Sequence, residues 1–325
     1  MALVKTNRSS LFLHQSLTLP VAPAEFIEVN QALVVVPDFA TIDTNRLTGA
    51  MNAKDASIDT CRTSTAFLAS VDMRETGTTT LNVKSGYAEL LKISGFEEAS
   101  APAIDTYELI NSSSNIGRGS AIVYMDDNKF EMTNTLVGST EMDFQIGQIA
   151  KCNTTLSGYM DSAIPVAEAN PTVTLSDENL HIVSCLDIVT VDGTVIPAEG
   201  IVIATNPDIA NTYTMGGASG LKEDTITDYA LTCAITFPVD SAVFGREASM
   251  IEAGDIVAIR IVIGADTNGL PVDGHSTLFL ANTTKAVTYS DTVNNDLLQR
   301  VLTLRLYDDG EAPALSIVTG AVSAL

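Results

Sequence analysis

Few residues of this chain have types and spacing suited to catalysis. The run D-G-H-S, from Asp273 to Ser276, places an acid, a base and a hydroxyl close together, with His275 as the base. These are the groups of a serine hydrolase, but the members of such a triad meet in space, and the strained G-x-S-x-G turn is absent. We therefore interpret D-G-H-S as a hairpin turn and expect no enzyme activity. Alanine substitution of His275 would test the hydrolase alternative.

Candidate ligands for metals and cofactors are scattered along the sequence. His14 and His181 are isolated, and the four cysteines contain no C-x-x-C pair of the kind that zinc sites use: Cys61, Cys152, Cys185 and Cys233. A phosphate-binding G-x-x-x-x-G-K-[ST] loop, an H-E-x-x-H helix and a Gly-rich dinucleotide fingerprint are all absent. We expect buried free thiols, no metal and no cofactor.

Two pairs of adjacent aspartates, at 126–127 and 308–309, could offer carboxylates to a calcium ion. Neither pair belongs to a twelve-residue EF-hand pattern. We expect both to be solvated aspartates in turns.

The charge balance is strongly acidic, with 17 basic and 40 acidic residues in 325 and a net charge of −23. Ordinary nucleic-acid binding needs Lys and Arg to neutralise phosphates, so this composition argues against it. Two explanations of the acidity remain open: solubility, and a surface that must repel a polyanion such as DNA.

The apolar residues are mostly Ala, Val, Ile and Leu, with abundant Thr and Ser and no Trp, which favours pleated sheets. No segment approaches the roughly 20 apolar residues that span a bilayer, and the first residues lack a signal-peptide apolar run. We expect a protein that is made in a cytoplasm and has no membrane partner.

One stretch, from Leu81 to Glu98, has a convincing helical pattern, and we expect a helix over about 85–94. Ser85 can cap its N-terminus, and Gly95 suits the left-handed position just past its end.

The predicted helix is amphipathic. Tyr87, Leu90 and Leu91 form one apolar stripe, and Glu89 and Lys92 are expected to face outward. Phe96 can fold back onto the stripe after the glycine, so the predicted core residues of this helix are Leu90, Leu91 and Phe96. A lone helix among strands indicates a plug over a β-sandwich or barrel, because an α/β enzyme would need strands and helices in alternation.

The rest of the chain has β patterns between polar segments. Residues 1–30 are expected to form an N-terminal arm, 32–37 a short buried strand, 53–74 one or two strands, and 99–119 a loop or second arm. A hairpin is expected around the D-D-N-K turn that begins at Asp126.

Strict alternation marks the strand that starts at Glu141. Glu141, Asp143 and Gln145 share one face, and Met142 and Phe144 lie on the other with Ile146. Three more strands are expected at 151–159, 255–263 and 301–307; the second should be covered on both faces apart from Arg260, and the third should turn its leucines inward.

The sequence also contains hints of an internal duplication. The stretch 45–72 resembles 211–240, and 125–138 resembles 307–320. A duplication predicts two similar β domains, 31–165 and 166–325. The second domain would then need its own helix, for which 245–254 is the one candidate and a poor one.

Taken in order, these features resemble the tail tube, or major tail, proteins of long-tailed, siphovirus-type bacteriophages. The resemblance rests on the L-L-x-x-x-G-F-E helix end, the Met-Asp-Asp turn and I-G-Q-I-A-K-C-N-T-T-L-S-G-Y from Ile146 to Tyr159. Four residues stand where the family has a Gly-Ala-Arg-Gly-like element and a closing glycine, although its arginine is missing here: Gly147, Lys151, Asn153 and Gly158. The run from Cys185 to Phe237 resembles the C-terminal portion of larger members.

The resemblance implies a mainly β tail-tube fold and a structural subunit of the virion tail, assembled in the host cytoplasm. Its partners would be further copies of itself in stacked rings, the tape measure protein, and the tail terminator and tip proteins. DNA would pass through the lumen without specific binding. Glu141, Asp143 and Gln145 are the residues we expect to face the lumen; outer solvent is the alternative.

Two open questions follow from this resemblance. Three chains would complete a pseudo-sixfold ring if both halves are tube units, and six if the second half is a decoration. A β-rich adhesin or surface-layer subunit is the alternative function; it should show a secretion signal or glycan-binding aromatics, and aromatic residues are only 6%.

Overall fold

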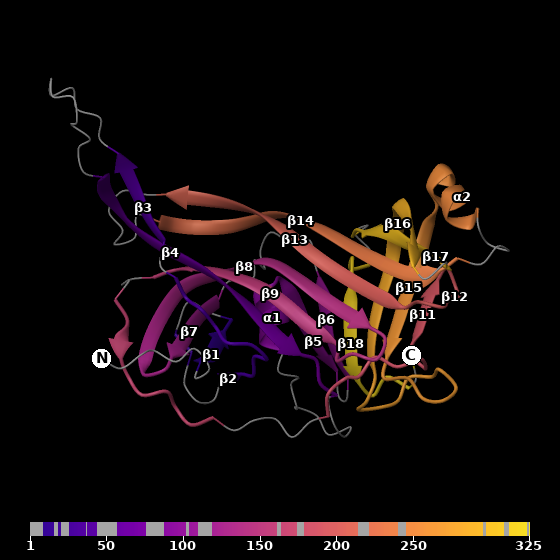
Figure 1. Ribbon diagram of the computed structural model, residues 1–325, viewed down its shortest axis with the longest axis horizontal. Helices are drawn as coiled ribbons and strands as arrows, with labels where there is room; N and C mark the ends of the chain where they lie inside the picture. The colour runs from indigo at the N-terminus through magenta and orange to yellow at the C-terminus, as the bar shows by residue number, and fades with distance from the viewer. Residues whose placement is uncertain are drawn as a thin grey trace.

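The computed structural model describes residues 9–15, 19–20, 26–36, 38–43, 57–75, 88–101, 104–109, 119–160, 164–173, 179–213, 221–239, 245–294, 297–308, 312–323 and 325. The described part is mainly β, as the sequence predicts, and its strands are joined in one large antiparallel sheet. The molecule is elongated, and several of its long strands run roughly along the longest axis (Figure 1).

The first half contains seven strands that pair in the spatial order β2, β1, β7, β8, β9, β4, β3. In chain order they are β1 (Ser9–His14), β2 (Phe26–Ile27), β3 (Asp38–Asp43), β4 (Ser57–Asp72), β7 (Gly119–Met125), β8 (Asn128–Gln145) and β9 (Lys151–Tyr159).

The second half repeats this arrangement in the spatial order β12, β11, β15, β16, β17, β14, β13. In chain order they are β11 (Ile188–Val191), β12 (Thr194–Ile196), β13 (Gly200–Tyr213), β14 (Leu221–Pro238), β15 (Ile256–Ile263), β16 (Thr277–Asn294) and β17 (Leu297–Leu306). A helix follows the fourth strand of each set: α1 (Ala88–Ile93) after β4, and α2 (Arg246–Ala253) after β14. The two sets thus share both their pairing and their order along the chain.

The four remaining strands connect the sets. They are β5 (Phe96–Ala101), β6 (Ile104–Leu109), β10 (Val166–Ala167) and β18 (Ser316–Gly320). The β5–β6 hairpin follows α1, and β6 pairs with β18, which also pairs with β16. The C-terminal strand is therefore hydrogen-bonded to both halves.

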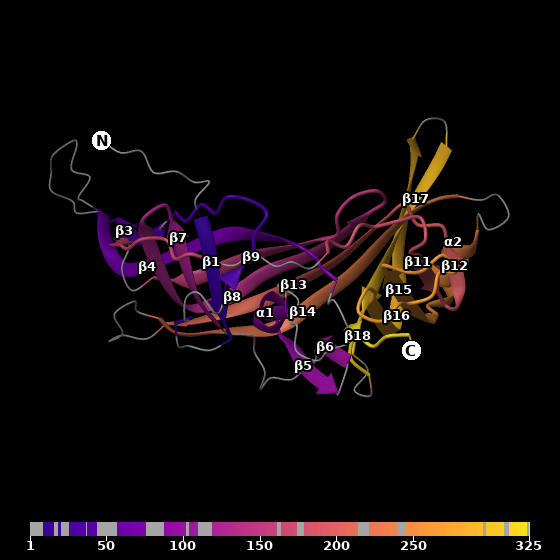
Figure 2. The same cartoon turned by 90° about the horizontal axis from the view of Figure 1, so that it is seen from below.

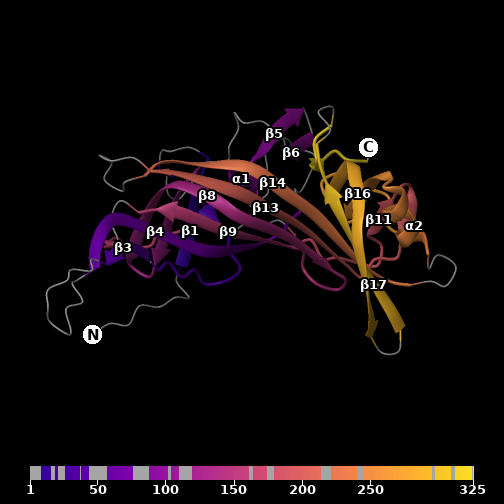
Figure 3. The same ribbon diagram turned by 90° about the horizontal axis from the view of Figure 1, so that it is seen from above.

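A direct joint between the halves is made by β8 and β13. These strands pair over six positions, from Gly200↔Gln145 to Thr205↔Thr140. Figure 3 shows β13 and β14 running beside β8 and β9. The expected division near 165, between 31–165 and 166–325, therefore does not coincide with a break in the sheet, and one apolar core contains residues of both halves.

Matching bulges fix the correspondence between the two sets. The β3–β4 register shifts directly after the pair Ala40↔Arg62, and the β13–β14 register shifts directly after Asp208↔Asp228. These positions are therefore equivalent. The sequence similarity of 45–72 and 211–240 includes the equivalent strands β4 and β14. The predicted correspondence of 125–138 with 307–320 was wrong. The first stretch spans the turn between β7 and β8, whereas the second contains β18, so the two are not equivalent elements.

Helix α1 is described over Ala88–Ile93, inside the predicted range 85–94, and Ser85 and Tyr87 lie outside the described residues. Leu90, Leu91 and Phe96 are fully buried. Gly95 has a φ of +94°, the left-handed conformation expected after the helix.

The outward orientation predicted for Lys92 was wrong. Lys92 is buried, and its ammonium group lies 2.9 Å from a Glu89 carboxylate oxygen and 2.6 Å from one of Glu98. Glu98 belongs to β5, which begins just after the helix, so the pair joins the helix to the hairpin that follows. Two carboxylates compensate the desolvation of the buried cation.

The expectation of a single helix was also wrong. Helix α2 has no apolar stripe like that of α1, and it is anchored instead by the buried carboxylate of Glu247. Glu247 accepts hydrogen bonds from Arg246 and, at 2.8 Å, from Arg300 of β17, whose side chain is 1% exposed. Arg300 also donates two bonds to Asp291 of β16 and lies over the ring of Tyr289. This cluster fixes α2 to the β16–β17 hairpin.

Several other segments differ from their predictions. The region expected to be an arm contains β1, whose Leu11, Phe12 and Leu13 are fully buried because it lies between β2 and β7. The segment 32–36 is extended but is not a strand, and 99–119 contains most of the β5–β6 hairpin.

In β15, the predicted full coverage begins only at Ile259, since Ile256 and Ala258 are exposed. The predicted hairpin at Asp126 and the strands at 151–159 and 301–307 are confirmed. The alternation from Glu141 is confirmed as far as Gln145. Ile146 lies in the following turn and is exposed.

Gly95 gives a test of how α1 is joined to the second half. A Cβ built at Gly95 would lie 2.0 Å from the hydroxyl oxygen of Tyr229 in β14, whereas a Cβ at Gly254, which also has a positive φ, meets nothing. We expect Gly95→Ala to lower the free energy of unfolding by roughly 3 kcal/mol, because overpacking adds to the left-handed strain. Gly254→Ala should cost about 1 kcal/mol.

Urea unfolding measures both values. Because the Tyr229 hydroxyl is buried without a hydrogen-bond partner, Tyr229→Phe alone should cost little. Combined with Gly95→Ala it should restore part of the loss. Equal costs for the two glycine variants would contradict the packing argument.

Candidate functional site

The residues predicted to face a lumen lie on the open side of β8. Glu141 is exposed and Asp143 and Gln145 are partly exposed, while Met142 and Phe144 between them are fully buried. The Gln145 amide donates to Asp143 at 3.1 Å and lies over Gly200 of β13, where a Cβ would come within 2.6 Å of it. The glycine therefore makes room for Gln145 on this face.

Strand pairing extends this open face over both halves of the molecule. One row of laterally paired residues passes through Asp143 and crosses strands β4, β9, β8, β13, β14, β17 and β16. In that order its residues are Asp72, Lys151, Asp143, Val202, Ala234, Thr303 and Thr288. In the row through Glu141 they are Ser70, Asn153, Glu141, Ala204, Thr232, Arg305 and Lys285. The sheet thus presents one broad surface on which charged, hydroxyl, amide and small apolar side chains are mixed.

The charge of this open face differs from that of the whole chain. Its two central rows contain three acidic residues, Asp72, Glu141 and Asp143, and three basic residues, namely Lys151, Arg305 and Lys285. The alternating pattern of β17 already predicts from the sequence that Arg305 points outward. The alignment of all six residues depends on strand register, for which the sequence offers no pattern.

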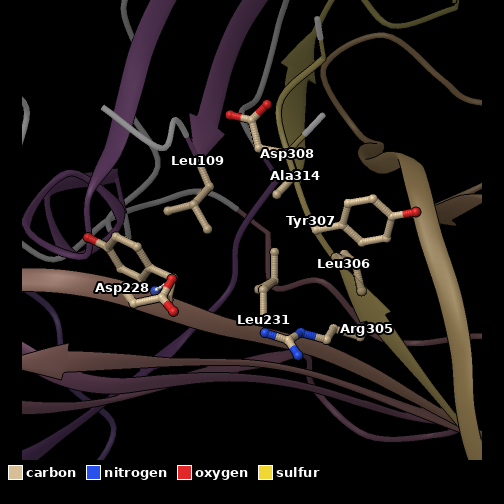
Figure 4. A pocket seen from close by; sticks show the side chains of 9 residues that line it. Leu109, Asp228, Leu231, Arg305, Leu306, Tyr307, Asp308 and Ala314 are labelled. Atoms are coloured by element: carbon tan, nitrogen blue, oxygen red, sulfur yellow. Dashed lines mark hydrogen bonds between the residues drawn. The ribbon is translucent and has the colours of Figure 1, made fainter. Parts of the chain in front are cut away.

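A small pocket lies where β6, β14 and β17 meet. It has a volume of about 120 Å³, and Figure 4 shows Leu109 and Leu231 approaching it from opposite walls with Arg305 and Asp308 nearby. Pockets for small-molecule ligands are typically about 300 to 1,000 Å³. This pocket is therefore too small for such a ligand, and we interpret it as a packing defect at the seam between strands.

The D-G-H-S segment is a turn between β15 and β16, as predicted. The Ser276 hydroxyl donates to the Gly264 carbonyl at 2.6 Å and accepts from the Val272 amide at 2.7 Å. His275 instead lies 2.8 Å from the carboxylate of Glu75. The serine hydroxyl thus closes the turn, and the geometry does not bring His275 to it as a base.

His181 is the buried histidine of the same region. Its Nε2 lies 3.0 Å from Thr277 Oγ1, and its backbone bonds to Met73 and Ala150. Desolvation lowers its pKa to about 4, although the nearby Glu75 carboxylate opposes the shift. The side chain is therefore neutral near pH 7, and it packs first-half residues against the β15–β16 turn.

Other predicted features are placed as follows. Asp126, with a φ of 58°, lies in the β7–β8 turn with Asp127; Asp308 follows β17, and Asp309 lies outside the described residues. Cys152 and Cys233 are buried free thiols whereas Cys185 is exposed, and Cys61 has no described side chain. Within the described ranges, no group of three or more His, Cys, Asp or Glu side chains is arranged to hold a metal.

None of the helices described is long and apolar enough to cross a membrane. Comparison of the sequence with protein-family models and with curated proteins finds no match.

The buried state of His181 predicts a pH-dependent stability. Since its pKa is about 4 in the folded protein and about 6.5 when unfolded, the unfolded state binds more protons between these values. Stability should be complete above pH 6.5 and fall as the pH drops towards 4, with a loss of about 2 kcal/mol between pH 7 and pH 5 from this group.

Urea unfolding at several pH values measures this loss. His181→Gln should remove most of this contribution, and His275→Gln, which removes the exposed neighbour, should keep most of it. Identical slopes for the His181 variant and the unaltered protein would disprove the assignment.

Proposed function

We propose that this chain is a structural tail tube subunit of a long-tailed bacteriophage, which assembles into stacked rings around a lumen that conducts DNA. The observation that carries the proposal is the repeated strand order of the two halves and their edge-to-edge joint between β8 and β13. Each chain then contributes two similar units joined edge to edge, and further copies can extend this series of units. Closure of such a head-to-tail series produces a ring.

The open sheet face supports a role as the lumen wall. Tight binding of DNA needs an excess of Lys and Arg, because each neutralised phosphate adds affinity. The two central rows instead combine hydroxyl groups with equal numbers of acidic and basic residues. Such a surface would let DNA slide without gripping it, and Glu141, Asp143 and Gln145 lie near its centre.

Because the halves share one strand order, we propose three chains in each ring. The tape measure protein and the terminator and tip proteins are then the partners expected inside the tube and at its ends.

Imaging of purified protein tests the proposal directly. Negative-stain electron microscopy should show hollow rods or stacked rings, and native mass spectrometry of a ring should give three times the chain mass, about 103 kDa from 34.3 kDa per chain. A strictly monomeric protein under all assembly conditions would refute the tube. A ring of six chains would keep the tube and reject the equivalence of the halves.

Charge reversal on the open face tests the lumen assignment. The double variant Glu141→Lys and Asp143→Lys should still form tubes but deliver DNA more slowly, by roughly tenfold, because added cations bind phosphates. The control Glu252→Lys and Asp255→Lys makes the same charge change on exposed residues at the end of α2. Equal delivery by particles with either variant would reject this face as the lumen.

A further inference from the structure

One edge of β16 is left without a strand partner. Pairing with β15 ends at Ile256↔Lys285, whereas the opposite edge remains bonded to β17 as far as Asn294↔Leu297. Among the described residues, no strand pairs with residues 286 to 294 on the edge of β16 that β15 occupies up to Lys285. The ends of β16 and β17 project beyond the rest of the sheet (Figure 2).

The equivalent stretch of β8 does have a partner. From the matched bulges, Asp72 of β4 corresponds to Pro238 of β14. In the first half, Asp72 pairs with Lys151 of β9, which pairs with Asp143 of β8. In the second half, Pro238 pairs with Gln299 of β17, which pairs with Thr292 of β16. Asp143 and Thr292 are therefore equivalent. Asp143 pairs with Val202 of β13, but Thr292 has no such partner on the corresponding edge among the described residues.

The first half also contains the counterpart of the β13 segment that β8 binds. Asp38↔Ser64 corresponds to Asn206↔Ala230, so counting back along the chain makes 32–36 equivalent to 200–204. Burial agrees with this alignment. Leu33 and Val35 are buried, as are Ile201 and Ile203, the two residues equivalent to them.

Segment 32–36 lies along β4, and no strand among the described residues pairs with it. The Asn30 amide donates to the Ser70 carbonyl, and Thr65 Oγ1 donates to the Val36 carbonyl. The amides of Leu33 and Val35 donate elsewhere, to Ser9 Oγ at 2.9 Å and to Met125 Sδ at 3.4 Å. A thioether is a weak acceptor, so a strand carbonyl could replace it with a gain.

We propose that segment 32–36 of one copy pairs antiparallel with 290–294 of a second copy, in the register Val34↔Thr292. This contact repeats between copies the β8–β13 joint within the chain, and it rests on the proposed function. Apolar side chains are exposed on both segments: Val34 is 52% exposed, Val36 65% and Val293 73%. Edge strands with exposed apolar residues favour pairing with another chain.

The placement of the two segments makes the contact head-to-tail. Segment 32–36 leads into β3, which lies towards one end of the longest axis, and β16 lies towards the other (Figure 1). Different surfaces therefore meet at each junction. Such heterologous contacts extend into rings or filaments and do not stop at a dimer.

Paired cysteines test this register. In a background of Cys61→Ser and Cys185→Ser, which removes the exposed thiol of Cys185 and the thiol whose side chain is not described, Val34→Cys with Thr292→Cys should give disulfide-linked chains after oxidation. Directly opposite residues of antiparallel strands have Cα atoms about 4.5 to 5.5 Å apart, within disulfide range. The matched control Val202→Cys with Asp143→Cys should cross-link inside single chains. Val34→Cys with Ser290→Cys, two residues out of register, should give at least tenfold less product.

The outcomes separate this contact from the tube itself. One outcome is that tubes form and the internal control cross-links, but the Val34–Thr292 pair gives no more product than the out-of-register control. That result would overturn the proposed edge and leave the proposed tube intact. Failure of all variants and of the unaltered protein to assemble would overturn both. Cross-links at the predicted pair alone would support both.

A blocking variant gives an independent measurement. Val34→Lys changes an exposed side chain, so the monomer should fold with an unchanged unfolding midpoint, yet assembly should need at least tenfold higher protein concentration. Leu68→Lys, at an exposed position of the neighbouring β4 outside the proposed contact, should assemble normally. Normal assembly by the Val34 variant would overturn the proposed edge.

Discussion

The antiparallel joint between β8 and β13 is the interaction on which the arrangement of the halves depends. It continues the backbone hydrogen bonds of one set of strands directly into the other. Its inward residues, such as Phe144 and Ile201, belong to one shared core, where Phe144 packs edge-on against Phe279 of β16 at 5.0 Å. Burial on one side also fixes the register, because a shift by one residue would turn the polar residues of β8 into the core.

The sequence predicted correctly those parts of the fold that depend on residues close together in the chain. The alternation from Glu141 to Gln145 and in β17 reports which face is buried, and the glycine after α1 reports the helix end. The mainly β class follows from the same patterns. The open face was predicted only in its β8 residues and in the outward residues of β17, such as Arg305, because strand register brings its other members beside them.

Long-range contacts explain the failures. Helix α2 has little apolar surface of its own and depends on the ion pair of Glu247 with Arg300, 53 residues away. Lys92 is buried because two carboxylates surround it. Strand β1 is short and follows a polar start, yet it is covered because β2 and β7 pair with both its edges. Apart from the i, i+3 pair of Glu89 with Lys92, none of these contacts has a local pattern, so the sequence could not predict them.

The buried Arg300 has a further consequence for folding at high concentration. Its equivalent position in the first half is Cys152, a small neutral thiol whose pKa burial raises to about 11. Two halves with one strand order could otherwise exchange β9 and β17 between copies. An exchanged β17 would bury a guanidinium without Glu247 and Asp291, and an exchanged β9 would leave those carboxylates uncompensated. An exchange of β9 and β17 between copies would therefore be unfavourable at this position.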